Sequence, residues 1–201
     1  MGRLATLLLA ALALQAHAQV IPFESGGLRY QALTKNGLTI MVAPFPSHVR
    51  DFTVLQVAVQ NGSKSSFTIR PEDFLYLQEN GTEVSAVPAR TVVDSLIDHA
   101  SKSDVIKLIT TYEQGIYGNK QYKATNGYEQ RRQSALAELT STRIKAAAAA
   151  SAIAFVLTKL PPGASTDGAV FYSMGGKPFT GGKLQVRVGA STFEFPVLSS
   201  Y

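Results

Sequence analysis

Histidines and acidic residues are the side chains with which this sequence could do chemistry. Its 201 residues include no cysteine and three histidines, His17, His48 and His99. Nucleophilic catalysis needs a nucleophile with a base in hydrogen-bond reach, and no Gly-x-Ser-x-Gly elbow or similar motif occurs. The sequence therefore predicts no catalytic residue. A hydrolase assembled from unconnected residues near His48 or His99 is the alternative.

Metal binding was considered at Asp94, Asp98 and His99, which fall in one predicted short helix. Asp94 and Asp98 are four residues apart and share a helix face, whereas His99 is turned about 100° from Asp98. A transition-metal site usually takes three or four ligands, and no Asp-x-Asp-x-Asp-Gly calcium loop occurs. The pattern is typical of a solvated acidic face, so we predict no metal site and no cofactor.

The remaining candidate motifs are turns. Glu72 and Asp73 follow Pro71 at a predicted corner, where Asp73 is expected to accept a backbone N–H rather than to form a glycosidase pair. The pairs Gly175-Gly176 and Gly181-Gly182 lack the Lys-Ser/Thr and the following helix of a phosphate-binding loop. We expect these pairs to be hairpin loops.

The N-terminus has the organisation of an export signal. Arg3 precedes an apolar run, Leu4–Leu14, and Ala16-His17-Ala18 is a small-x-small cleavage site. We predict a signal peptide at 1–18 and a mature chain at 19–201, with an uncleaved anchor as the alternative. The run is too short to cross about 30 Å of hydrocarbon as a stable anchor. An exported chain without cysteine favours a bacterial periplasmic or secreted location over an animal one.

The charge of the chain is mildly basic. The formal charge of +5 falls to +4 when Arg3 is removed. Lysines and arginines are scattered, and Arg131-Arg132 is the only adjacent basic pair. A nucleic-acid interface would need basic residues clustered on one face with aromatics between them. We therefore predict no nucleic-acid partner.

Short strands are predicted on either side of a helical region. Asn36-Gly37 separates two alternating runs, which is a strong hairpin signal. In 52–60, Thr53, Leu55, Val57 and Val59 form the more apolar face and are expected to face the core. The other predicted strands are 28–33, 38–42, 67–69, 74–77, 82–84, 169–172, 184–188 and 193–198.

Three helices are predicted between the strands, and each begins with a capping residue and an acid three positions later. They cover about 91–100, the segment from Ser101, and about 128–159, where Pro161-Pro162 ends the helix. The last helix is either continuous or broken at Thr140-Ser141-Thr142, whose side chains compete for backbone hydrogen bonds. One face of it carries residues with alternating spacings of three and four: Leu136, Leu139, Arg143, Ala146, Ala150, Ile153 and Leu157.

We call these seven residues the helix seam and take them as the candidate interaction face. The preferred interpretation of its alanine-rich part is core packing. Contact with a partner helix and contact with a membrane are the alternatives, although the apolar segment is too short to span.

The strands resemble those of bacterial extracytoplasmic Ig-like sandwich domains, a group largely without assigned activity. The resemblance is carried by 54–61, by Pro71-Glu72-Asp73-Phe74, and by Leu160-Pro161-Pro162-Gly163 followed by 167–171. It implies a mainly β fold with a helical insertion (α+β): an antiparallel Ig-like β-sandwich interrupted by two short helices and one long alanine-rich helix. It implies no catalytic residues.

We therefore expect a single domain at 19–201 with a helical insertion at about 91–159. The function expected is that of an exported, non-catalytic binding or accessory protein of the bacterial cell envelope. Its partner would be another envelope protein, with no membrane span after signal cleavage. The alternatives are a structural envelope protein that self-associates through the helix seam, and the hydrolase named above.

Overall fold

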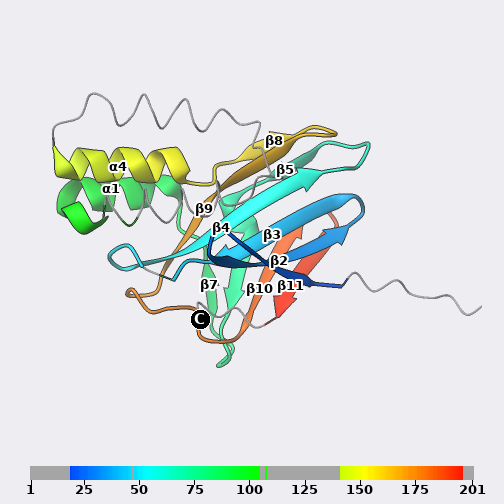
Figure 1. Cartoon of the computed structure of the whole chain (residues 1–201), viewed down its shortest axis with the longest axis horizontal. Helices are drawn as coiled ribbons and strands as arrows, with labels where there is room; N and C mark the ends of the chain where they lie inside the picture. The colour runs from blue at the N-terminus through cyan, green and yellow to red at the C-terminus, as the bar shows by residue number, and fades with distance from the viewer. Residues whose placement is uncertain (1–18, 47, 105–106, 108–140, 197–201) are drawn as a thin grey trace, which may run out of the picture.

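The computed structural model of the protein describes residues 19–46, 48–104, 107 and 141–196 (Figure 1). The predicted signal peptide at 1–18, and Leu136 and Leu139 of the helix seam, lie outside these residues. The described chain is mainly antiparallel β-structure with a few helices, which confirms the β-rich fold class.

The strands form two larger sheets and a two-stranded ribbon. The first sheet contains, in spatial order, β1 (Ile21–Ser25), β2 (Leu28–Lys35), β3 (Leu38–Pro44), β4 (Phe52–Asn61) and β9 (Ser165–Ser173). The second contains β11 (Ser191–Pro196), β10 (Lys183–Val188), β6 (Phe74–Leu77) and β7 (Glu83–Ser85). The ribbon pairs β5 (Phe67–Ile69) with β8 (Thr158–Leu160), and a 3-10 turn, Pro71–Asp73, precedes β6.

Turn chemistry determines where several strands end. Asn36 and Gly37 have φ values of 52° and 77°, as the predicted hairpin between β2 and β3 requires. At the corner before β6, the Arg70 N–H donates to the Asp73 carboxylate at 2.8 Å, which confirms the predicted role of Asp73. Sequence analysis missed β1, whose Pro22 is tolerated because β1 lies at the edge of its sheet.

One hydrophobic core lies between the two larger sheets. Leu55, Val57 and Val59 of β4 are fully buried in it, so the predicted core face is confirmed. They pack with Phe74 of β6 and Val186 of β10. The sheets therefore face each other through apolar side chains, as two-layered β proteins do.

A second core lies on the other face of the first sheet, beneath α1 (Ala89–His99) and α4 (Thr142–Ile153). The two helices lie side by side (Figure 1). Val92 and Leu96 of α1 are buried in the same cluster as Val54 and Phe171 of the sheet. Strand β4 is consequently buried on both faces, which an alternating pattern alone does not predict.

The described members of the helix seam do not form one exposed face. Ala146, Ala150 and Ile153 of α4 are buried against α1 and the first sheet. Arg143 is exposed, and Leu157, 60% exposed, lies beyond the helix. Small side chains let the α4 backbone approach its neighbours closely, so core packing is the role of these alanines.

The predicted helix end at Lys159 is wrong. Helix α4 begins at Thr142, the position of the predicted break, but it ends at Ile153. Ala154 forms a parallel bridge with Ala169, and the Phe155 N–H donates to the Ala169 carbonyl at 2.8 Å. Pairing with β9 thus replaces the last helical turn, and the β-branched Val156 and Thr158 that follow favour an extended chain.

Asn61 at the end of β4 forms hydrogen bonds with the loop that follows it and with the β5–β8 ribbon. Its side-chain amide donates to the carbonyls of Ser65 and Leu160 at 2.7 and 3.0 Å, and its Oδ1 accepts from the backbone and the hydroxyl of Ser63. Asn61 is 0% exposed. The Asn61-Gly62-Ser63 tripeptide therefore serves as a structural turn.

Candidate functional site

The connection from β9 to β10, residues 174–182, is fixed to the scaffold at both ends. The N–H groups of Met174 and Gly176 both donate to the Asp51 carbonyl at 3.1 Å. The Thr53 hydroxyl donates to the Lys177 carbonyl. Because these bonds satisfy backbone groups along the loop, the loop is ordered without secondary structure of its own.

Phe179 anchors the middle of this connection. Its side chain is 0% exposed and makes edge-to-face contacts with Tyr76 and Tyr172, at centroid distances of 4.9 and 5.5 Å. The Tyr76 hydroxyl donates to the Gly181 carbonyl at 2.8 Å. This aromatic group ties the loop to both larger sheets, since Tyr76 belongs to β6 and Tyr172 to β9.

Burial raises the pKa of Tyr76, and the nearby Glu79 charge adds to this, while a hydrogen bond from the Thr180 backbone works in the opposite direction. Burial also raises the pKa of Tyr172. Both phenols are therefore neutral at physiological pH and act as structural donors. Neither is available as a base.

The two glycines at the end of the connection allow it to lie directly on the β6–β7 turn. Gly181 and Gly182 both have a φ of 73°. A Cβ on Gly182 would lie 2.2 Å from the Leu77 carbonyl oxygen, and one on Gly181 would lie 2.0 Å from Glu79 Oε1. At Gly182 no other residue fits without displacing the backbone of the turn, whereas at Gly181 the Glu79 side chain would have to move.

The β6–β7 turn, residues 78–82, is closed by its own hydrogen bonds. The Gln78 N–H donates to the Thr82 carbonyl at 2.9 Å, and the Gly81 N–H to the Gln78 carbonyl at 3.0 Å. The Thr82 N–H donates to Asn80 Oδ1 at 2.9 Å. Because Asn80 uses its oxygen within the turn, its amide N–H groups remain to serve as donors.

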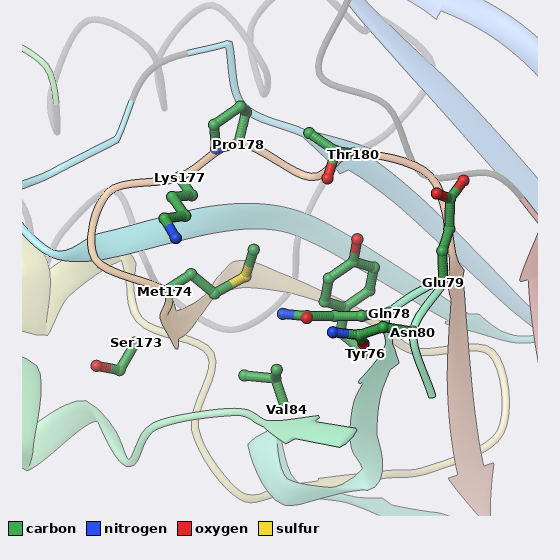
Figure 2. A pocket seen from close by; sticks show the side chains of 10 residues that line it. All are labelled: Tyr76, Gln78, Glu79, Asn80, Val84, Ser173, Met174, Lys177, Pro178 and Thr180. Carbon is green, nitrogen blue, oxygen red and sulfur yellow. The ribbon is translucent and has the colours of Figure 1, made fainter. Parts of the chain in front are cut away.

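A pocket of about 370 Å³ lies between these two segments (Figure 2). Figure 2 shows Gln78 and Asn80 extending into it from the turn, and Lys177 reaching into it from the opposite loop. The lining consists of Tyr76, Gln78, Glu79, Asn80, Val84, Ser173, Met174, Lys177, Pro178 and Thr180. Most of these residues are polar and lie on loops whose backbones are held by hydrogen bonds, so the pocket offers hydrogen-bonding groups to a small molecule.

A larger and more apolar hollow of about 500 Å³ lies beside this pocket. It is lined by Leu77, Gln78, Glu79, Gly81, Gly182, Lys183 and Pro196. Gln78 and Glu79 border both spaces. The turn therefore separates a polar pocket from an apolar one.

Comparisons with protein-family models, with curated proteins and with solved structures found no significant match.

The residues first considered for chemistry do not converge within the described chain. His48 and His99 are both exposed, and neither lines the two pockets. Asp94 pairs with Arg90 at 3.8 Å on the outer surface of α1. The described residues contain no group of three or more potential metal ligands.

The pocket residues were not identified from the sequence. They come from segments about a hundred residues apart: the link between the predicted strands 74–77 and 82–84, and the loops at 175–176 and 181–182. The glycine pairs at 175–176 and 181–182 were the available signal, because they mark a connection that approaches another backbone closely. The prediction that these pairs are hairpin loops is wrong, because β9 and β10 belong to different sheets and residues 174–182 cross from one sheet to the other.

No helix in the described ranges combines the length and the apolar character that crossing a bilayer would require.

Proposed function

We propose that this chain is an exported, non-catalytic binding or accessory protein of a bacterial cell envelope, and that the pocket between residues 78–80 and 173–180 is its binding site. One observation carries the proposal: side chains with hydrogen-bonding capacity converge from two loops, of which one is closed by its own hydrogen bonds and the other is held by bonds to Asp51 and Thr53 and by the buried Phe179. Because the backbone of both loops is fixed, the conformational entropy lost on binding is confined to exposed side chains such as Lys177.

The alternative functions have less support. Self-association through the helix seam would need a free apolar face, and Ala146, Ala150 and Ile153 are occupied by α1 and the first sheet. Hydrolysis around His48 or His99 would need a neighbouring carboxylate to orient the imidazole. The ion pairs between described residues are Arg90–Asp94 and Lys183–Glu194, and neither includes a histidine.

The Ig-like assignment is part of the same proposal. It is supported by two antiparallel sheets that share a core and by a chain that moves from one sheet to the other between β4 and β6 and again between β9 and β10. The meander of β1 to β4 within one sheet departs from the Ig order of strands.

Binding can be tested by titrating isotope-labelled mature protein, residues 19–201, with a library of small polar molecules while recording backbone amide shifts. We expect the shifts to gather at 78–80 and 173–180. Gln78→Ala and Lys177→Ala should weaken binding, whereas Lys159→Ala, an exposed lysine on β8, should not. Shifts that gather elsewhere, or a library without any binder, would overturn the proposal.

Export can be tested independently of binding. We expect N-terminal sequencing of the protein recovered from a bacterial periplasmic fraction to begin at Gln19, because Ala16-His17-Ala18 is the cleavage site. Recovery of the intact chain from the cytoplasm would contradict the envelope location.

A further inference from the structure

Two opposite charges line the same pocket without neutralising each other. Lys177 and Glu79 both border it. In Figure 2, Lys177 descends from the 174–182 connection on one side, and Glu79 rises from the β6–β7 turn on the other. The ion pairs between described residues join Arg90 to Asp94 and Lys183 to Glu194, so neither Lys177 nor Glu79 belongs to one.

Glu79 is an exposed residue whose side chain extends from the turn towards the end of the 174–182 connection. Its carboxylate lies against Gly181, so close that a Cβ there would overlap Oε1. Glu79 and Tyr76 both line the pocket. The Glu79 carboxylate therefore offers an acceptor to a cationic group at one end of the pocket.

Three further side chains bring N–H donors to the pocket. The Lys177 ammonium has three N–H donors, and the Asn80 amide has its nitrogen available because its oxygen accepts from Thr82. The Gln78 side chain, like that of Asn80, extends from the turn into the pocket (Figure 2). An ammonium and two amides facing one space suit a carboxylate, whose oxygens accept several hydrogen bonds.

We propose that the pocket binds a small zwitterion, with the ligand carboxylate at Lys177 and the ligand ammonium at Glu79. The ligand class is a dipeptide, whose charged termini are separated by its backbone, because about 370 Å³ is near the lower end of the range for small-molecule sites. Met174 and Val84 supply apolar contact between the charged ends. This inference rests on the proposed binding function.

Three probes of similar size separate the charges. Alanyl-alanine carries both charges, N-acetyl-alanyl-alanine only the carboxylate, and alanyl-alanine amide only the ammonium. We expect alanyl-alanine to bind about tenfold more tightly than either blocked form, because each loses one charge-assisted contact. Calorimetric or amide-shift titration of residues 19–201 measures the three affinities.

Variants assign each end. Lys177→Met should abolish the preference for alanyl-alanine over its amide and keep the preference over its N-acetyl form. Glu79→Gln should abolish the preference over the N-acetyl form and keep the preference over the amide. Lys177→Arg should retain the wild-type order, and Lys102→Met, on the exposed surface near α1, serves as the control.

Equal binding of all three peptides would overturn the zwitterion while leaving the binding pocket in place. Binding of none would also overturn it, and the library titration above would then decide the proposed function separately.

Discussion

A single buried asparagine holds together three segments of this protein. Asn61 bonds its own loop through Ser63 and Ser65, and it bonds the β5–β8 ribbon through the Leu160 carbonyl. Its backbone adds bonds to Gly163 and Ala164. No other side-chain type supplies two donors and an acceptor of this size, so the residue type follows from the hydrogen bonds that must be satisfied.

Replacement of Asn61 by Ala should lower the free energy of unfolding by about 3 kcal/mol, because several buried groups lose their partners at once. Chemical denaturation measures the change. Asn80→Ala is the matched control, since Asn80 is exposed and supports one turn bond. It should cost about 1 kcal/mol or less. Similar losses for the two variants would show that Asn61 has no special structural role.

Tyr172 should contribute to sensitivity to alkali. Burial raises its pKa in the folded state above the ordinary value of 10.0. Above the ordinary pKa, the phenol of the unfolded chain loses its proton while that of the folded protein keeps it. The stability that Tyr172 contributes is therefore complete below the ordinary pKa and is lost as the pH rises above it. Tyr172→Phe should flatten the fall in melting temperature at alkaline pH. Burial also raises the pKa of Tyr30 and Tyr76, and these two residues remain in both proteins, so an unchanged slope would count against Tyr172 as a source.

At the scale of elements, the packing partners of helix α4 determine the residues on its inner face and the position of its C-terminal end. Its inner face consists of alanines because α1 and the first sheet approach its backbone. Its C-terminal continuation contacts β9 so closely that a Cβ on Gly168 would lie 2.7 Å from the Phe155 Cα. Phe155 then enters the inter-sheet core and meets Phe74 edge to face at 5.6 Å.

Ala150→Leu should therefore destabilise the protein by about 1–3 kcal/mol through overpacking, because Ala150 is 0% exposed. The control is Ala148→Leu on the same helix, which is only half-buried and should change stability by about 0.5 kcal/mol or less. Thermal unfolding of both variants provides the measurement. A tolerated leucine at position 150 would mean that the layer contains unfilled space.

Sequence patterns predicted elements where local chemistry decides the structure. The Asn36-Gly37 hairpin, the Pro71 corner and the capping box at Ser101, whose N–H and hydroxyl both bond Asp104, depend on a few neighbouring residues. The end of α4 depends instead on β9, and the pocket depends on two distant loops. Those features follow from tertiary pairing, which periodicity along the chain does not encode.

At the scale of the whole molecule, helices α1 and α4, which belong to the excursion between β7 and β8, are part of the core. They cover Val54 and Phe171, each 1% exposed. An insertion that only decorated the surface could be removed without exposing such residues. The predicted insertion is therefore also a structural layer.

Deleting residues 89–157 and joining the ends with a Gly-Ser linker should abolish cooperative unfolding and create binding sites for a hydrophobic dye. The control changes only the outer surface of the helices: Ile97 and Ile144 are 45% and 47% exposed. Replacing both with Ser should preserve the unfolding transition. A deletion variant that melts cooperatively at the wild-type temperature would contradict the structural role of the excursion.

Because β4 is buried on both faces, its amide protons should exchange more slowly than those of the helices. An opening of the helix layer uncovers one face of β4, and an opening of the second sheet uncovers the other, but its hydrogen bonds to β3 and β9 survive either event. Amide protons of β4 should then exchange with solvent only when the whole chain unfolds, whereas those of α1 can exchange through a local opening. The exchange rate of β4 would thus report global stability. The difference between the exchange rates of α1 and β4 would measure how often the helices open while the rest of the protein stays folded.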